Sequence, residues 1–305
     1  MSEARVVSLL PAATEMIAAL GAWDRLVGVT HECDHPAAAL HLPKVTSSIV
    51  DPGASAAAVD LAVRDAVASG AALFTLDEAR LRALQPSILI TQGLCDVCAV
   101  AEGDVFRLAA SLPVPATVVS LGARTLDEVL DSLLTLAHAL DADDEGAELV
   151  AGLRARMRRV HETLKAARAP RPRVAVIEWT DPLYVAGHWV PDMVRRAGGI
   201  DVAATAGEHS YPRPVAQLRD ADPEVLVFAP CGYGLARACD EARLTLARDE
   251  WRWARDRRVV VMDGNAFTSR PGPRLIDGIE IMARLFNPKL FSPLLPDRGA
   301  AISPG

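Results

Sequence analysis

Short apolar runs alternate along the chain with segments of helical periodicity. Runs of four to six apolar residues that end in polar or Gly/Pro-containing turns predict β-strands. We expect strands at residues 6–10, 26–29, 88–91 and 116–121, and again at 174–177, 183–186, 225–228 and 259–262. Because helical patterns separate most of these runs, the sequence predicts mainly parallel sheets flanked by helices.

The pattern changes in the middle of the chain. Thr125 and Glu128 form a capping box that starts one helix. A longer helix is expected at 143–168 because Leu149, Leu153, Met157, Val160 and Leu164 repeat at helical spacing before Pro170 stops it. At 1.5 Å per residue this helix would be about 39 Å long, more than one small domain needs.

The sequence therefore predicts an α/β protein with two lobes joined by one long rigid helix. We expect an N-terminal α/β lobe at 1–124, connecting helices at 125–170, a C-terminal α/β lobe at 171–288 and a disordered tail at 289–305. The long helix also carries an arginine run, with arginines at 154, 156, 158 and 159. Runs of charge on a helix usually face solvent, so we expect these arginines to form a solvated face.

Composition restricts the possible partners. Half of the 305 residues are hydrophobic and the net charge is −7, which is typical of a globular protein and argues against nucleic acid as a partner. No run of about 18 apolar residues predicts a membrane span. Residues 1–11, MSEARVVSLLP, have one acid, one base and an apolar run that Pro11 interrupts, so we expect a cytoplasmic protein without a secretory signal.

Four of the five cysteines follow predicted strands, namely Cys33, Cys95, Cys98 and Cys231. In open α/β sheets, ligands collect at the carboxyl ends of the strands. These thiols could bind zinc or an iron–sulfur cluster, or the Cys95/Cys98 pair could be a redox site. Alternatively they could be buried apolar side chains, as free cysteines often are and as we expect for Cys239.

Several stretches resemble a known family. Residues 5–16 (RVVSLLPAATEM), 20–21 (LG), 26–30 (LVGVT) and 222–227 (DPEVLV) are similar to helical-backbone (class III) periplasmic binding proteins, in particular the cobalamin-binding proteins of vitamin B12 ABC transporters. The resemblance covers nearly the whole chain. It implies two α/β lobes, one long helix and a ligand held between the lobes. It also implies docking to an ABC permease through acidic residues, although we expect this chain to have no export signal.

A corrinoid ligand would need rigid apolar walls and a few polar anchors. We expect the walls to come from Trp179, Trp189 and Tyr233, and an axial imidazole from His188. The full set of candidate ligand-binding residues is His31, Glu32, Gln92, Glu178, Trp179, His188, Trp189, Tyr233, Asn265 and Arg270. For each the alternative is an ordinary packing or capping role.

No motif indicates catalysis. The sequence contains no Gly-x-Ser-x-Gly elbow, phosphate-binding P-loop or Gly-x-Gly-x-x-Gly fingerprint. We therefore expect a non-catalytic protein that binds cobalamin or a related corrinoid. The alternatives are a metalloprotein with zinc or an iron–sulfur site built from the four cysteines, and a thiol redox protein.

Overall fold

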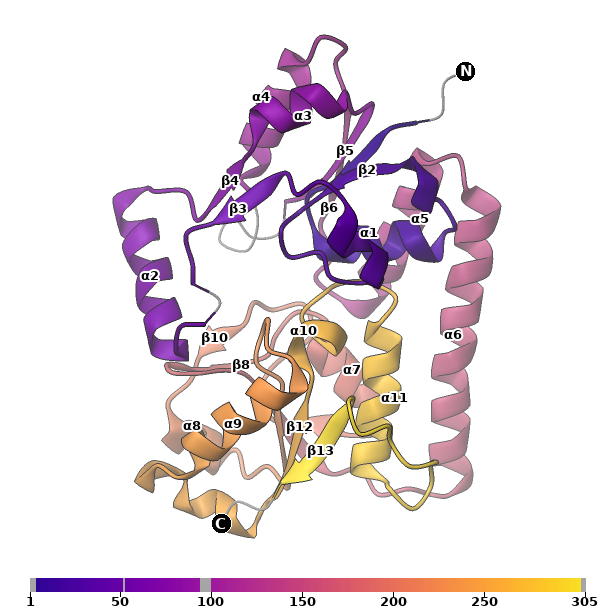
Figure 1. Cartoon of the computed structure of the whole chain (residues 1–305). Coiled ribbons are helices and arrows are strands. Elements are labelled where there is room, and N and C mark those ends of the chain that lie inside the picture. The colour runs from indigo at the N-terminus through magenta and orange to yellow at the C-terminus, as the bar shows by residue number, and fades with distance from the viewer. Residues whose placement is uncertain (1–3, 52, 94–99, 303–305) are drawn as a thin grey trace. The chain divides into compact units, whose positions relative to one another are not determined.

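The computed structural model describes residues 4–51, 53–93 and 100–302 (Figure 1). The chain forms two compact units. Unit 1 contains residues 1–123 and 128–151, and unit 2 contains 124–127 and 152–305. The predicted α/β class is confirmed, and each unit has its own sheet and its own core.

Unit 1 is built on a four-stranded parallel sheet in the order β2-β1-β5-β6. The strands are β1 (Val6–Ser8), β2 (Leu26–Val29), β5 (Ile88–Gln92) and β6 (Thr117–Leu121), and the helices α1 (Pro11–Ala19), α4 (Glu102–Ser111) and α5 (Leu126–Ala139) connect or follow them. β1 is fully buried, as expected for a parallel sheet covered on both faces.

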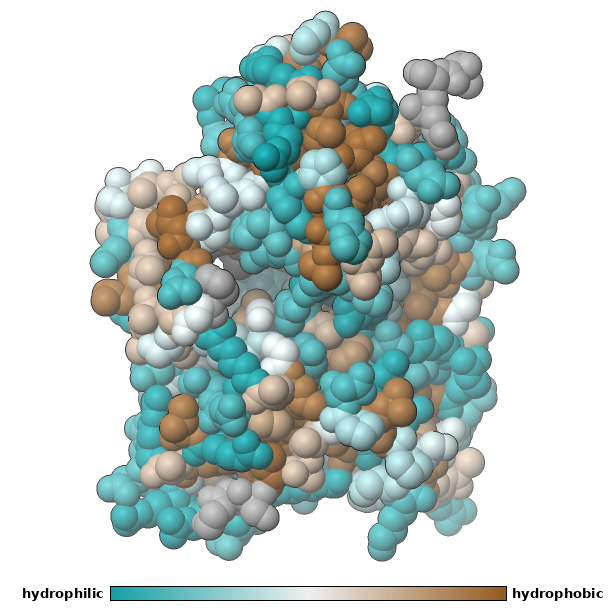
Figure 2. Space-filling model, viewed as in Figure 1, coloured by the Kyte–Doolittle hydropathy of each residue, from teal (hydrophilic) through white to brown (hydrophobic). Residues whose placement is uncertain are grey.

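A smaller layer of unit 1 lies between β2 and β5 in the sequence. It consists of the antiparallel strands β3 (Thr46–Ser48) and β4 (Phe74–Leu76) with helices α2 (Ala56–Ser69) and α3 (Glu78–Leu84). Helix α2 buries only Ala56 and Ala66, while Leu61 and Val67 are each more than half exposed. Apolar side chains are accordingly visible over α2 at the left of Figure 2.

Unit 2 is built on a seven-stranded mixed sheet. Its strands are β7 (Arg173–Thr180), β8 (Leu183–Val185), β9 (Ile200–Asp201), β10 (Tyr211–Pro212), β11 (Val225–Phe228), β12 (Arg258–Met262) and β13 (Gly299–Ile302). Its helices are α7 (Val190–Arg196), α8 (Val215–Asp220), α9 (Leu235–Leu246), α10 (Gly264–Phe267) and α11 (Leu275–Phe286). β7, β11 and β12 are parallel neighbours, so their carboxyl ends share one edge of the sheet.

One prediction for unit 2 needs correction. The tail expected to be disordered beyond residue 288 contains β13, which pairs antiparallel with β12. The run at 183–186 forms β8, but β8 is antiparallel to β7 because only a two-residue connection separates them. The very short strands β9 and β10 have too few residues to produce a visible alternation.

The predicted long helix is confirmed as α6 (Asp143–Ala166), whose residues belong partly to unit 1 and partly to unit 2. Its 24 residues correspond to about 36 Å. Asp143, Asp144 and Glu145 occupy its first turn, where negative charge stabilises the amino end of a helix. In the described part of the chain no helix is both long enough and apolar enough to cross a membrane.

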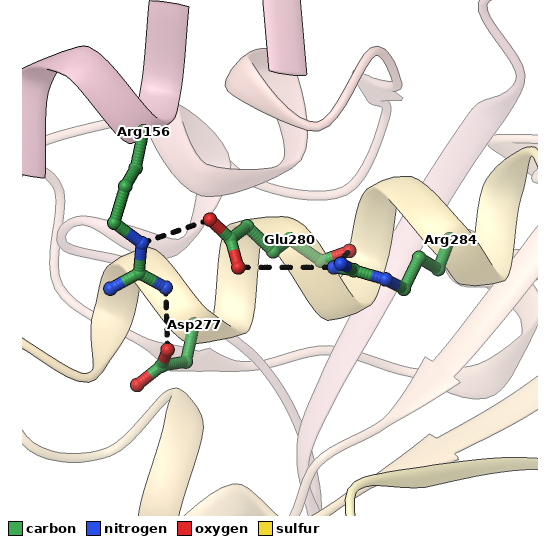
Figure 3. Close-up of polar contacts among 4 residues, drawn as sticks. All are labelled: Arg156, Asp277, Glu280 and Arg284. Atoms are coloured by element: carbon green, nitrogen blue, oxygen red, sulfur yellow. Dashed lines mark hydrogen bonds and ion pairs between the residues drawn. The ribbon is translucent and has the colours of Figure 1, made fainter. Parts of the chain in front are cut away.

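The arginines on α6 do not behave alike. Arg156 is only 28% exposed, and its guanidinium donates from Nε to Glu280 Oε1 (2.9 Å) and from Nη2 to Asp277 Oδ1 (2.5 Å) on α11 (Figure 3). The hydrogen bond to Glu280 is the main reason that the pKa of Arg156 is raised. The expectation of a wholly solvated arginine face is therefore wrong for Arg156, which attaches α6 to α11.

Candidate functional site

The carboxyl ends of three parallel strands of unit 2 carry polar side chains. Glu178 lies near the end of β7, Cys231 follows β11, and Asn265 follows β12. Backbone hydrogen bonds connect these ends, from Cys231 N–H to Glu178 O (3.0 Å) and from Asn265 N–H to Tyr233 O (3.2 Å). The topology therefore places these residues at one edge, where α/β proteins commonly bind ligands.

Close backbone packing fixes the turn after β12. A Cβ atom on Gly264 would lie 2.2 Å from Pro230 O and 2.6 Å from Ala229 O, so this position requires glycine. Asp263 caps the short helix α10 by accepting from Ala266 N–H at 2.7 Å. The turn thus has one geometry, which determines where Asn265 points.

Arg270 and Asn265 are held together in the segment after α10. Arg270 Nη2 donates to Asn265 Oδ1 at 3.0 Å, and Arg270 is buried. Ser269 donates its hydroxyl to Gly264 O (2.8 Å), which ties this segment back to the start of α10. Both residues singled out in the sequence therefore belong to one hydrogen-bonded group.

The connection between β9 and β10 meets Glu178 and the loop after β8. Ser210 donates to Glu178 Oε2 (2.8 Å) and accepts from Gly187 N–H (3.0 Å). A Cβ atom on Gly187 would lie 2.4 Å from Glu208 O, and His188 N–H donates to the same carbonyl at 2.6 Å. These contacts hold His188 with a positive φ of 52°.

His188 is paired with a residue that the sequence patterns did not reveal. His188 Nε2 and His209 Nδ1 are 3.1 Å apart, and the two rings are nearly perpendicular with centroids 5.0 Å apart. The pKa of His188 is lowered, first by burial and then by electrostatic interactions with His209 and Arg124. Near pH 7 His188 is therefore neutral, which is the form of imidazole that binds metals.

No sequence signal marks His209 strongly. It lies in the connection between β9 and β10, and only the pairing of these two short strands with β7 and β8 brings it beside His188. We call the residues that take part in these hydrogen bonds at the strand-end edge the unit 2 network; it consists of Glu178, His188, His209, Ser210, Cys231, Asn265 and Arg270.

The aromatic candidates lie mostly inside unit 2. Trp189 is 6% exposed and its indole Nε1 donates to Thr268 O at 2.7 Å. Tyr233 is 4% exposed, packs edge-on against Trp179 at 5.5 Å and is covered by the Arg237 guanidinium at 3.7 Å. Trp189 and Tyr233 offer a ligand little surface, and their predicted role as ligand walls stays a prediction.

The unit 1 candidates follow β2 and β5. His31 Nδ1 lies 2.7 Å from Thr46 Oγ1, and its backbone N–H donates to the same oxygen at 3.0 Å. Burial, followed by the charge of Lys44, lowers the pKa of His31. Glu32 N–H donates to Thr30 Oγ1 (3.3 Å), and Gln92 is the last residue of β5. His31 is thus hydrogen-bonded inside unit 1.

The cysteines differ sharply in their surroundings. Cys33 is 1% exposed, and its Sγ lies 3.1 Å from Thr14 Oγ1 on α1. Cys231 is exposed in unit 2, and burial raises the pKa of Cys239, which lies on α9. Cys95 and Cys98 lie outside the described residues. Among residues 4–51, 53–93 and 100–302, no three His, Cys, Asp or Glu side chains are arranged to hold a metal ion.

Comparison with known proteins gives the family. The sequence profile described as "Periplasmic binding protein" matches residues 6–251. The chain belongs to this family. The family resemblance expected from residues 5–16 and 222–227 is thereby confirmed.

Individual members of the periplasmic binding protein family differ in the ligands that they are named for. The Vitamin B12-binding protein of Vibrio cholerae serotype O1 is 23% identical over 279 residues, which are 90% of this chain and 86% of that protein. The periplasmic heme-binding protein of Pseudomonas aeruginosa has a TM-score of 0.73 at 25% identity and covers 97% of both chains. The crystal structure of the Vibrio cholerae vitamin B12-binding protein has a TM-score of 0.65 at 19% identity and covers 92% of this chain and 96% of that one. The family thus indicates a small-molecule ligand without selecting one.

Proposed function

We propose that this protein is a non-catalytic binding protein for cobalamin or a related corrinoid. The observation that carries the proposal is the His188–His209 pair, which is connected through the neighbouring Ser210 to Glu178 at the strand-end edge of unit 2. The likeness to the Vibrio cholerae vitamin B12-binding protein supports the choice of ligand.

The chemistry of the histidine pair suits a metal-centred macrocycle. His209 is exposed, and because its Nδ1 is engaged with His188, its Nε2 is the nitrogen left for a ligand. A hydrogen bond to the second ring nitrogen orients a ligating imidazole and selects its tautomer. Cobalt in a corrinoid accepts such a nitrogen as an axial ligand, while Asn265 and Arg270 supply polar groups suited to the amide edge.

Absorbance titration of the purified protein with hydroxocobalamin tests the proposal directly. We expect saturable binding with a spectral change, because an imidazole that replaces the axial water alters the absorption of the cobalt. His209→Ala and His188→Ala should each weaken binding by about tenfold or more, as losses at or beside a metal ligand usually do. The matched control is His41→Ala, which removes an exposed imidazole in unit 1.

Two results would reject the corrinoid proposal. The first is no binding up to about 100 μM, a generous limit because a Kd of 1 μM corresponds to only −8.2 kcal/mol. The second is binding that both histidine substitutions leave unchanged.

Heme is a second candidate ligand. The specific observation in its favour is the likeness to the Pseudomonas aeruginosa heme-binding protein, and the same histidine pair could ligate iron. A parallel titration with hemin distinguishes the two ligands, since the better ligand should bind about tenfold or more tightly if the pocket is selective.

The predicted contributions of unit 1 and of the cysteines remain proposals. His31→Ala and Gln92→Ala should weaken corrinoid binding if unit 1 also contacts the ligand. The zinc or iron–sulfur alternative depends mainly on Cys95 and Cys98, because the buried Cys33 sulfur is already in contact with Thr14. Metal analysis after anaerobic purification decides it, and metal-free protein that binds a corrinoid would eliminate it.

The transport partner and the cellular location are also proposals. The family supports an ABC permease as partner. A cytoplasmic location stays a proposal, and fractionation of cells that express the protein tests it. Recovery in the periplasmic or membrane fraction would overturn that location.

A further inference from the structure

Unit 2 contains a basic groove on the side formed by α6 and α7. A cavity of about 710 Å³ is lined there by seven Lys and Arg side chains and by one acid, Asp127. We call this cavity the basic groove; its principal cations are Arg154, Arg158, Lys165, Arg168, Arg195 and Arg196. All of its lining residues belong to unit 2.

Helical spacing produces one wall of the groove. Arg154, Arg158 and Lys165 are separated by four and seven residues, so they share one face of α6. Met157 and Leu164 lie on the same side and are buried, which gives the groove an apolar floor. Arg156, by contrast, points to α11 and takes no part.

The groove is closed by a close approach of α6 to the end of α7. A Cβ atom on Gly198 would lie 2.8 Å from Leu164 Cδ1, and Gly198 has a φ of 91°, so only glycine fits without strain. The hollow is thus formed by α6, the turn that follows it and the end of α7. An ordinary solvated arginine face lies on a single helix. Here the cations come from three segments and line the same cavity.

The cations on the α6 side lack neutralising partners. In the part of the chain that the structure describes, Arg154, Arg158, Lys165 and Arg168 form no ion pair. On the α7 side, Arg195 pairs with Asp192 (2.5 Å), and Arg196 has only a long contact of 3.6 Å to Asp127. Cations gathered in this way repel each other. The cluster also contrasts with the rest of the protein, whose net charge is −7.

We propose that the basic groove binds a small soluble molecule carrying several phosphate groups. Arginine guanidinium groups bind phosphate oxygens through pairs of parallel hydrogen bonds, and several such groups around one hollow suit several phosphates. The volume lies within the range of small-molecule sites. The groove is separate from the unit 2 network, and the proposal does not rest on a corrinoid ligand.

Calorimetric titration with inorganic triphosphate tests this site on the full chain. The variant is Arg154→Gln/Arg158→Gln, and the matched control is Arg159→Gln, an exposed arginine of the same helix that does not line the groove. Glutamine favours helix nearly as well as arginine, so both variants should fold, which circular dichroism checks. We expect the double variant to weaken triphosphate binding by about tenfold or more, since charge-assisted hydrogen bonds contribute about 1.5–3 kcal/mol each and 1.4 kcal/mol is tenfold. Arg159→Gln should change it by less than about twofold, the effect of one remote, screened charge.

Three outcomes would overturn the proposal. The first is no binding of triphosphate up to about 1 mM, where a Kd corresponds to only −4.1 kcal/mol. The second is an equal loss in Arg159→Gln and in the double variant, which would show only diffuse charge attraction. The third is sedimentation with phosphatidylglycerol vesicles that Arg154→Gln/Arg158→Gln abolishes, which would assign the groove to a membrane surface.

Discussion

The two units treat the carboxyl ends of their parallel strands differently. In unit 1, His31 is hydrogen-bonded to Thr46 and the Cys33 sulfur contacts Thr14 in the interior. In unit 2, the residues of the unit 2 network form several hydrogen-bonded groups, and His209 and Cys231 are exposed. These histidine and cysteine side chains are thus half-buried or buried in unit 1 and exposed in unit 2.

The difference shows what a strand-end position means. It brings a side chain to the edge of a sheet, but the neighbouring segment decides whether that side chain is covered. In unit 1, the segment from residue 30 to β3 places Thr46 against His31. In unit 2, the connection between β9 and β10 instead brings His209 and Ser210 to His188 and Glu178. We therefore expect the polar anchors for a ligand to be concentrated in unit 2.

The sharpest test of this comparison replaces one glycine by alanine in each unit. The two glycines are Gly264, which lies in the turn after β12, and Gly93, which follows β5. Gly264→Ala places a methyl group 2.2 Å from Pro230 O, so the backbone of unit 2 must move. We expect a loss of about 3 kcal/mol of stability or more, the upper range for overpacking, together with impaired ligand binding. Urea unfolding followed by tryptophan fluorescence measures it, because four of the five tryptophans lie in unit 2.

The control is Gly93→Ala after β5 in unit 1. Among the described residues, the three atoms nearest to the added methyl group all belong to the Glu102 carboxylate, at 3.2–3.3 Å, which lies at the end of a flexible side chain. The change in stability should stay within about 0.5 kcal/mol, as for most surface substitutions. If Gly264→Ala and Gly93→Ala lowered the stability equally, the two turns would be equally constrained. The proposed difference between the strand ends of the two units would then be wrong.

Most of the fold could be predicted from hydrophobic periodicity. All eight predicted strands and the long helix α6 are present, since buried parallel strands and amphipathic helices have strong patterns. β13 was missed because its residues, GAAI, are small and partly exposed, and pairing with β12 rather than local propensity makes them a strand.

The sequence predicts only those candidate site residues that lie at or just after a strand. Glu178 lies near the end of β7, while His188, Asn265 and Arg270 follow strands, and all four belong to the unit 2 network. His209 could not be found because its position depends on a pairing between residues 21 apart in the sequence. The contact of Trp189 with the carbonyl of Thr268 could not be foreseen either, because the two residues are 79 positions apart in the sequence.

The attachment of α6 extends the comparison between the units. In unit 1, α6 packs closely on α5, where a Cβ atom on Gly146 would lie 2.4 Å from Ala137 Cβ. In unit 2, Arg156 instead pairs with Asp277 and Glu280. Arg156→Met should cost about 2 kcal/mol, because two half-buried carboxylates lose a charged donor.

Urea unfolding of Arg156→Met and of the control Arg159→Met measures this effect. Arg159 is exposed, so its substitution should change stability by less than about 0.5 kcal/mol. Adding Asp277→Asn and Glu280→Gln to Arg156→Met should restore part of the loss, since the carboxylates no longer repel each other. If Arg156→Met and Arg159→Met change the free energy of unfolding equally, the ion pairs of Arg156 do not stabilise the packing of α6 on α11.

A buried acid gives unit 2 a pH dependence. Burial raises the pKa of Asp201 to about 6, although the amides of Ala203 and Ala204 and the charge of Arg213 act in the opposite direction. Because the folded pKa is above the unfolded one, the favourable contribution is complete below about pH 4 and is lost as the pH rises through about 6. From pH 4.5 to 7 this group should lower the stability by about 1–2 kcal/mol.

Asp201→Asn isolates that contribution. The amide oxygen can still accept from Ala203 N–H and Ala204 N–H, while the charge is removed. The difference in unfolding free energy between variant and wild type should therefore shift in favour of the variant as the pH rises from 4.5 to 7. A difference that stays constant with pH would show that Asp201 ionises normally in the folded protein.

The smallest expected effects come from two hydroxyl groups that have the same local role in the two units. Thr46 Oγ1 contacts His31 in unit 1, and Ser210 Oγ contacts Glu178 and Gly187 in unit 2. Thr46→Val and Ser210→Ala should each cost about 1 kcal/mol, the usual net contribution of an intramolecular hydrogen bond. The two variants should differ in ligand binding, because only Ser210→Ala removes a hydrogen bond of Glu178 within the network that we propose to bind the ligand. Titration of both variants with hydroxocobalamin measures the difference, and a loss of affinity in Thr46→Val as large as in Ser210→Ala would show that unit 1 supplies polar anchors as well.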